Sequence, residues 1–554
     1  MHTRPKKRSL LFAVILLLLG AALGMQIDAA VSGDDTFEQL KKLEDAFLVI
    51  DRQYVEKVNP KVLAESAIAG MLKALDPHST FIPAEEVAEL QESYRGSFGG
   101  IGIWFEPAAT EKDTAKVTST IPDGPSEMVG LMPGDRIVAI NDSSAIGMNS
   151  QAIQKRLKGL VGTKVKVTVI RPGARRPLDF VITRDQIPLY SIDSAYMVDD
   201  RTGYVRIGRF AMTTHQEFVE HMRRLKARGM QRLILDLRDN PGGIKQTAVQ
   251  VADELLKAGK TIVYTRGRNP AESEVDRSTP GGLFEEEPVI VLVNGNSASG
   301  SEIVAGALQD HDRALIVGRR TFGKALVQRP FPLSDGSVLQ VTVSRYYTPA
   351  GRLIQTPYEN GDLEGYFEQK VATRELNLDE VPDSLKYKTA HGRVVVGGGG
   401  ILPDVVVTAD STHPFLAPVV MAVRERALDV RFIRDWFNRH ERALREQWAD
   451  RQEAFMQTFE VDEALWQEFW RYAAEEGPLH LVSDGAAAPA EGRFARSEAE
   501  AHRAVLATLL KARLAQRLYR SEAGYPIFNP IEPDFQQAMQ LWKRAEALAA
   551  FHIR

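Results

Sequence analysis

The sequence predicts a multidomain α+β protein, and three observations support this. Its 554 residues exceed what one hydrophobic core usually organises. With 44% hydrophobic and 26% charged residues, it has the composition of an ordinary folded protein. The hydrophobic pattern also changes along the chain. We expect an N-terminal helical unit over residues 31–93, a β-rich domain over 94–186, an α/β core over 187–410 and a C-terminal helical extension over 411–554.

Composition excludes several functions. The 69 basic and 73 acidic residues give a formal charge of -4, which offers no electrostatic footprint for nucleic acid. The absence of cysteine excludes disulfides, thiolate metal sites and a cysteine nucleophile. His215 and His221 lack the H-E-x-x-H spacing of a zinc site. We therefore expect no metal and no cofactor.

Residues 1–30 form a predicted signal or anchor segment. Basic residues between Arg4 and Arg8 precede an uninterrupted apolar run over residues 10–23. This run is short for a membrane span, but extended to Ile27 it could still cross a bilayer. The basic flank would leave the N-terminus in the cytoplasm and the bulk outside. We expect a periplasmic or other extracytoplasmic protein. An uncleaved inner-membrane anchor is favoured over a cleaved signal peptide, because no small-x-small cleavage motif stands out.

The regions that follow differ in their periodicity. Apolar residues recur at the helical period from Phe37 to Leu75, where Asp76 and Pro77 end the helix. Within the α/β core, continuous apolar runs over 233–237 and 289–293 alternate with predicted helices over 249–256 and 302–308. Such runs are typical of strands covered on both faces.

The pattern beyond His413 is helical almost to the end. It contains five of the six tryptophans, whose spacing is typical of a helix core. Residues 486–489 are predicted to form a linker within this region. Its paired amphipathic stretches raise the hypothesis of a homodimer formed through the helical ends.

The most informative stretch is a predicted strand that leads directly into the turn of residues 294–299 and then a helix. Such a turn exposes the Ser299 hydroxyl near the free N–H groups of the helix, where negative charge is stabilised. The same residues satisfy the S-x-x-E capping box with Glu302, so Ser299 as a simple helix cap is the alternative. A G-x-S-x-G elbow is absent, because Ser301 stands where glycine would be required.

A lysine is the candidate general base, since no histidine is suitably placed in the sequence. Burial disfavours the ammonium form and can bring a lysine pKa toward neutrality. Lys324 lies between Gly323 and three apolar residues, an unusual place for a solvated lysine. Gln328, four residues later, is expected on the same strand face, where it could orient the amine.

The β-rich region resembles a PDZ domain in its glycine-rich loop and in the segment 130–137. The loop ends in Gly100, Ile101, Gly102 and Ile103. Successive glycines can free backbone N–H groups to hold a terminal carboxylate, while the next strand pairs with the peptide. The alternative is a glycine-rich hairpin that packs on a neighbour.

Over residues 35–410 the chain resembles the carboxyl-terminal processing (tail-specific) proteases, the S41 serine peptidases. The serine cluster, the lysine segment and the motif of residues 235–243 carry this resemblance. It implies a ClpP/crotonase-like core, Ser299 as nucleophile and Lys324, 25 residues later, as base. It also implies an oxyanion hole from the backbone N–H groups of Gly243 and Gly300. The implied substrates are exported proteins with a free C-terminus.

Two other functions stay open on the sequence. One is an anchored PDZ scaffold with a non-catalytic core, against which the intact Ser299, Lys324 and Gln328 argue. The other is a histidine-dependent hydrolase on the same core.

Overall fold

The computed structural model describes residues 34–553 apart from 109, 111, 122–123, 172, 360, 373–380, 409–412 and 485–491. The predicted segment 1–30 and the predicted linker 486–489 therefore lie outside the described residues. In the described part of the chain, no helix is long and apolar enough to cross a membrane. The chain divides into two compact units, residues 1–81 and 82–554, which are described separately.

The described part of the first unit is helical, as predicted. Helix α2 spans Asp34–Gln53 and helix α3 spans Pro60–Lys73. Asn59 caps α3 by accepting the N–H of Lys61 at 3.0 Å, and proline occupies the first helical position. Phe37, Leu40 and Val49 of α2 remain 75%, 59% and 59% exposed. This helix therefore presents an apolar surface.

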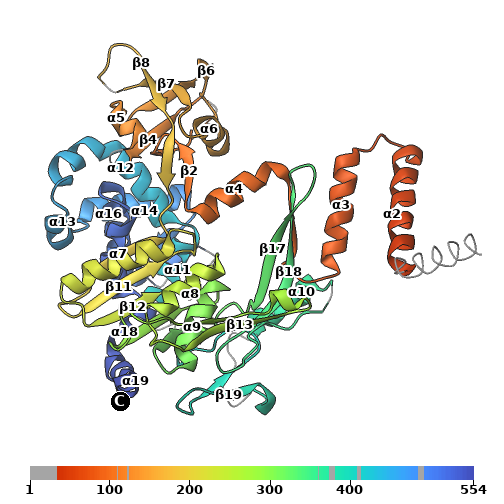
Figure 1. The fold of residues 1–554 in the computed structure, drawn as a ribbon. Helices are drawn as coiled ribbons and strands as arrows, with labels where there is room; N and C mark the ends of the chain where they lie inside the picture. Colours follow the sequence, from red (N-terminus) through yellow and green to blue (C-terminus); the bar gives the residue numbers. More distant parts are fainter. Residues whose placement is uncertain are drawn as a thin grey trace, which may run out of the picture. The chain divides into compact units, whose positions relative to one another are not determined.

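The second unit begins with α4 (Ala84–Arg95), followed by the β-rich domain (Figure 1). One antiparallel sheet has the order β3 (Ile103–Glu106), β4 (Ala115–Thr120), β5 (Arg136–Ile140), β7 (Lys164–Ile170) and β8 (Leu178–Thr183), with β6 (Ser143–Ser144) pairing with β5. Two helices, α5 (Pro125–Met128) and α6 (Ser150–Leu157), complete the domain. Alternate residues of β7, namely Val165, Val167 and Val169, point into its core.

A second sheet carries the α/β core. Its order is β10 (Ile192–Met197), β11 (Thr202–Ile207), β12 (Arg232–Asp236), β15 (Val289–Val293), β16 (Leu315–Gly318) and β21 (Val405–Val406). Only the β10–β11 pair is antiparallel. The helices that connect the parallel strands include α7 (Thr214–Ala227), α8 (Lys245–Asp253) and α9 (Gly300–Asp310). Helix α8 begins earlier than predicted, because its polar first turn hides the start of the apolar pattern.

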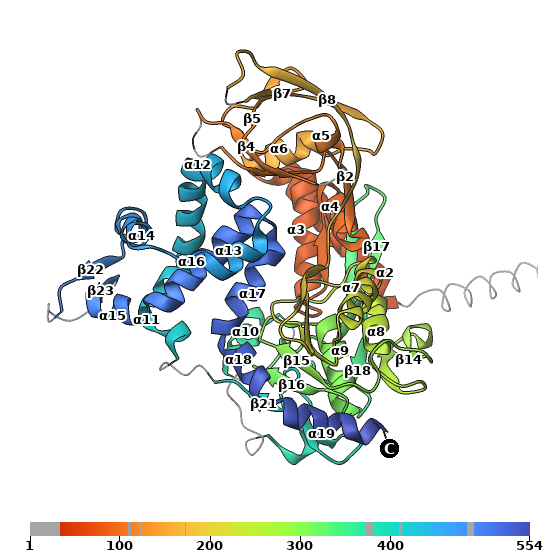
Figure 2. The same ribbon diagram turned by 90° about the vertical axis from the view of Figure 1, so that its left-hand side faces the viewer.

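The two faces of this sheet are covered by different parts of the chain. Leu233 and Leu235 pack with the helices α7, α8 and α9, whereas the intervening Ile234 packs on the opposite face. That opposite face is covered by α18 (Pro533–Gln540) and α19 (Trp542–Ile553), which contact β15 and β16 (Figures 1 and 2). Parallel sheets are normally buried on both faces. The end of the C-terminal extension therefore completes the core.

A further antiparallel sheet lies on the other side of the connecting helices. It includes β13 (Thr261–Gly267), β14 (Val275–Arg277), β17 (Leu326–Pro332) and β18 (Val338–Tyr347). Ile262, Val263 and Tyr346 share one hydrophobic cluster with α7, α8 and α9. The helices are thus enclosed between two sheets.

The rest of the C-terminal extension has a hydrophobic core of its own. Its main helices are α11 (Pro418–Glu425), α12 (Leu428–Trp448), α14 (Glu463–Glu476) and α16 (Arg503–Leu518). Trp448, Trp466 and Trp470 are buried in this core, as the sequence predicted. The short strands β22 (His480–Val482) and β23 (Arg493–Ala495) were not predicted.

Truncating Trp542 tests whether α19 supports the sheet of the α/β core. Trp542 is 6% exposed and lies 4.4 Å from the Arg232 guanidinium. Trp542→Ala should lower the free energy of unfolding by about 3–5 kcal/mol in urea denaturation followed by circular dichroism. The adjacent, exposed Lys543→Ala should change it by no more than about 0.5 kcal/mol. Equal effects of the two substitutions would contradict the covering role of α19.

Candidate active site

The turn between β15 and α9 presents Ser299 at the end of a buried strand. Its neighbours are fixed, because the Ser297 hydroxyl donates to the Leu237 carbonyl at 2.8 Å and the Ser301 hydroxyl to the Asn240 carbonyl at 3.0 Å. Ser299 itself is half-buried and has φ 51° and ψ -108°. A non-glycine residue at positive φ is strained, and such residues cluster at functional sites.

The Glu302 carboxylate brings the segments of Ser299 and Lys324 together. One of its oxygens, Oε2, accepts the backbone N–H groups of Ser299 and of Lys324, each at 2.9 Å. The other, Oε1, accepts the N–H of Gly323 at 2.7 Å and the hydroxyl of Thr321 at 2.6 Å. Burial raises the pKa of Glu302, and these hydrogen bonds oppose that shift. The predicted capping box is therefore present, but its glutamate also reaches the candidate base.

Gln328 lies within strand β17, but Lys324 lies outside it. Strand β17 begins at Leu326, two residues after Lys324. Beside Gln328 the pairing passes from Val327–Ser344 to Gln328–Thr342, which leaves one extra residue on β18. The Gln328 amide donates to the Thr342 hydroxyl on β18 at 3.1 Å. Its contact with the Lys324 amine stays a prediction.

The loop after β12 lies directly against Ser299. A Cβ at Gly242 would stand 2.7 Å from the Ser299 Cβ and 2.8 Å from the Gly300 nitrogen. Gly243 has φ 140°, and a Cβ there would lie 2.1 Å from the Phe210 carbonyl oxygen. Neither the N–H of Gly243 nor that of Gly300 has a hydrogen-bond partner among the described residues. Two backbone donors thus flank the turn that carries Ser299.

A buried ion-pair network supports the base of this loop. Arg238 Nη2 lies 2.6 Å from Asp236 Oδ2, and Arg238 also pairs with Glu532 and Asp534 of the C-terminal extension. Burial opposes ionisation of Asp236, but the guanidinium groups of Arg238 and Arg206 outweigh it and hold its pKa well below the usual range. Sequence reasoning missed this contact, because Glu532 lies 294 positions after Arg238 and no local pattern links them.

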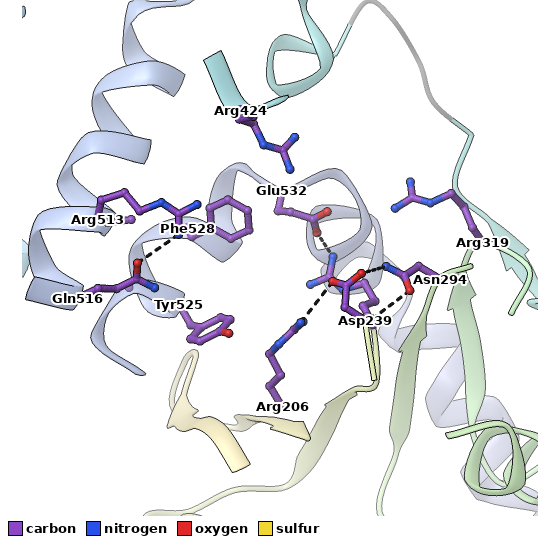
Figure 3. Close-up of a pocket in the computed structure, with 13 residues that line it drawn as sticks. Arg206, Asp239, Asn294, Arg319, Arg424, Arg513, Gln516, Tyr525, Phe528 and Glu532 are labelled. Carbon is purple, nitrogen blue, oxygen red and sulfur yellow. Dashed lines mark hydrogen bonds and ion pairs between the residues drawn. The ribbon is translucent and has the colours of Figure 1, made fainter. Parts of the chain in front are cut away.

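A polar cavity of about 450 Å³ adjoins this network. Figure 3 shows that its arginines converge from both the core and the C-terminal extension, with Glu532 and Asp239 among them. Five arginines contribute to its wall, namely Arg206, Arg238, Arg319, Arg424 and Arg513. Ser299 and Lys324 are not among the lining residues, so this cavity is separate from the candidate catalytic groups.

The glycine-rich loop of the β-rich domain differs from the predicted nest. Gly100 ends β2 (Ser97–Gly100), which pairs with β9 (Asp185–Pro188). The side chain of Ile101 is 2% exposed and belongs to the domain core, so only its backbone is available to a ligand. Gly102 has φ 72°, and Ile103 begins β3. Fewer than the four predicted residues are therefore available to form the candidate carboxylate site.

The histidines near the core have other partners. His215 Nε2 lies 2.7 Å from a Glu254 oxygen, and His311 Nε2 lies 2.7 Å from the Thr261 carbonyl oxygen. Within the described ranges, no group of three or more histidine and carboxylate side chains could hold a metal ion.

Comparison with known proteins establishes the family. The model of Peptidase family S41 matches residues 201–362, that of the PDZ domain 91–170, and that of the activating protease CtpB N-terminal domain 22–86. The carboxy-terminal-processing protease of Bartonella bacilliformis is 37% identical over 354 residues, or 63% of this chain and 80% of that protein. The chain belongs to peptidase family S41. It is a serine-type, carboxy-terminal processing peptidase with a PDZ domain, as the sequence predicted.

The chain is also similar to two further proteins. The carboxy-terminal processing protease CtpA of Bacillus subtilis is 33% identical over 344 residues, which are 62% of this chain and 72% of that protein. Among solved structures, a photosystem II D1 C-terminal processing protease is 31% identical, with a TM-score of 0.33, and covers 58% of this chain and 91% of its own.

Gly242 provides a test of the close approach to Ser299 in this S41 peptidase. Gly242→Ala should lower casein hydrolysis by about 100-fold, because the added Cβ would displace the turn that carries Ser299, the candidate nucleophile. Gly259→Ala is the matched control, since Gly259 also has positive φ, 81° against 95°, but no atom within 4 Å of an added Cβ. An equal loss in both variants would show that backbone strain, not the contact with Ser299, causes the effect.

Proposed function

We propose that this peptidase is an exported serine endopeptidase with Ser299 as nucleophile and Lys324 as general base. The observation that carries the proposal is the Glu302 carboxylate, which binds the backbone of both residues through a single oxygen. The proposed limits of its domains are those predicted from the sequence, 31–93, 94–186, 187–410 and 411–554. The family matches at 22–86, 91–170 and 201–362 support this order.

In the proposed mechanism, the neutral Lys324 amine accepts the proton of Ser299 as Oγ attacks a substrate carbonyl. The protonated amine then donates this proton to the leaving amine, and water hydrolyses the acyl-enzyme. The half-buried position of Lys324 favours the neutral amine, because desolvation disfavours the ammonium form. Gln328, on the strand that follows, is assigned the orientation of the amine.

The backbone N–H groups of Gly243 and Gly300 form the proposed oxyanion hole. Gly300 opens helix α9, so the positive end of the helix dipole adds to its N–H. The contact of Gly242 with Ser299 and Gly300 supports a short distance between the two donors. Fixed donors at the position of developing charge are usually the largest electrostatic contribution to such a reaction.

The proposed substrates are exported proteins that are recognised through a free C-terminus. The backbone at Gly100, Ile101 and Gly102 would bind the terminal carboxylate, and the strand beginning at Ile103 would pair with the tail. Gly102 at φ 72° supports this assignment, because a left-handed residue can turn successive N–H groups to one side.

Localisation and assembly are part of the proposal. The basic and apolar pattern of residues 1–30 supports export, with retention in the inner membrane as an anchor. N-terminal sequencing of the mature protein would distinguish an anchor from a cleaved signal peptide. A homodimer through the helical ends of the chain is also proposed, and the exposed apolar residues of α2, in the N-terminal helical unit, support it. A monomer in light scattering of the full chain would argue against it.

Substitution of the two catalytic residues tests the dyad. Ser299→Ala and Lys324→Ala should each lower casein hydrolysis by at least about 1000-fold, while circular dichroism stays unchanged. Lys324→Arg keeps the positive charge but cannot act as a base near neutral pH, so it should be equally inactive. Substantial cleavage by the arginine variant would refute a general-base role for Lys324.

Tail recognition is tested with paired peptide substrates that end in a free carboxylate or in an amide. The wild-type enzyme should cleave the free acid at least about 10-fold more efficiently, since a charge-assisted contact to the carboxylate is worth about 1.5–3 kcal/mol. Gly102→Val should reduce this preference, because the valine side chain would keep the terminal carboxylate from the backbone of the loop. Equal kcat/KM for acid and amide in the wild-type enzyme would contradict carboxylate capture.

A further inference from the structure

The buried carboxylate of Glu302 does more than cap the start of helix α9. A capping residue needs to bind only the N–H groups of its own helix start. Three of the four hydrogen bonds to Glu302 come instead from Thr321, Gly323 and Lys324, which lie between β16 and β17. We propose that Glu302 is a positioning residue that fixes the backbones of Ser299 and Lys324 against each other; this rests on the proposed function of these two residues.

The chemistry of the site fits an ionised carboxylate. Glu302 is completely buried, and each of its two oxygens accepts two hydrogen bonds. An ionised carboxylate is purely an acceptor, so four donors satisfy it without a proton of its own. Its place in the first turn of α9 adds the favourable field of the helix N-terminus. A neutral amide would instead point an NH₂ group at two of these donors.

Tyr346 on β18 holds the same two residues from their carbonyl side. Its hydroxyl donates to the Lys324 carbonyl at 2.7 Å and lies 3.2 Å from the Ser299 carbonyl. Its own N–H donates to the Ala325 carbonyl at 2.9 Å. The side chain is 1% exposed. Nucleophile and base are thus linked twice, through N–H groups by Glu302 and through carbonyls by Tyr346.

This linkage has a consequence for catalysis. It sustains the strained backbone of Ser299, so its loss lets the hydroxyl move relative to the amine. A displacement of about 1 Å can cost about 100-fold in rate. Such a loss falls on kcat rather than on KM.

The experiment compares Glu302→Gln with Asp404→Asn in the full chain, measuring the melting temperature and the kcat and KM for a peptide substrate. Asp404 is a matched control. Its carboxylate is also nearly buried, accepts the N–H of Ile316 at 2.8 Å and pairs with Arg393. It has no hydrogen bond to Ser299 or to the backbone of Lys324.

Glu302→Gln should lower kcat by about 100-fold and change KM by less than about 3-fold. Asp404→Asn should lower thermal stability while kcat and KM stay within about 3-fold of the wild-type values. A Glu302→Gln enzyme with wild-type kcat, or with a loss of kcat that matches that of the Asp404→Asn enzyme, would overturn the proposal.

Tyr346→Phe is a second variant, which tests the linkage of Ser299 and Lys324 if Glu302→Gln does not fold. It removes one hydroxyl group and no charge, so kcat should fall by about 10-fold. Unchanged kcat would refute the linkage through Tyr346. Ser299→Ala distinguishes failure of the proposed dyad from failure of the positioning role. If that variant still cleaves, the dyad itself fails. An inactive Ser299→Ala enzyme beside a fully active Glu302→Gln enzyme refutes only the positioning role.

Discussion

The ion pair between Asp236 and Arg238 stands where three parts of the catalytic unit meet. Asp236 ends the central strand β12 and accepts the Tyr204 hydroxyl, and Arg238 begins the loop that continues to Gly242 and Gly243. From the other side, Glu532 and Asp534 bind the same guanidinium. Removing one partner of such a buried network typically costs about 3–5 kcal/mol, because the remaining charge stays buried. The sheet, the glycine loop and the C-terminal extension therefore depend on one another.

The sequence predicted those features that local patterns encode. The apolar runs at 233–237 and 289–293 lie on β12 and β15, and the turn that presents Ser299 lies between strand and helix as expected. The missed features depend on contacts between distant residues. The sequence indicated Glu302 only as the partner of Ser299 in a capping box. Its hydrogen bonds to residues 321–324 form only after the chain has folded back, so no local pattern predicts them. Lys324 was expected on the same strand as Gln328, but it precedes β17, because the start of that strand is set by pairing with β18 and not by hydrophobic alternation.

The glycine-rich loop of the PDZ domain could likewise be predicted only in part from local sequence. Glycine composition predicted an open loop, yet Gly100 pairs in a β ladder and Ile101 packs into the core. Strand pairing takes up backbone groups that composition alone leaves free. The loop therefore presents a short stretch of backbone, in which Gly102 supplies the only left-handed turn between Gly100 and Ile103.

The covering of the catalytic sheet by α18 and α19 bears on how the enzyme matures. Residues 535–548 supply one hydrophobic face of strands that end more than a hundred residues earlier. That face stays open to water until residues 535–548 have been synthesised and have packed against it. A chain interrupted before residue 533 would therefore retain Ser299 and Lys324 beside a sheet with one face uncovered.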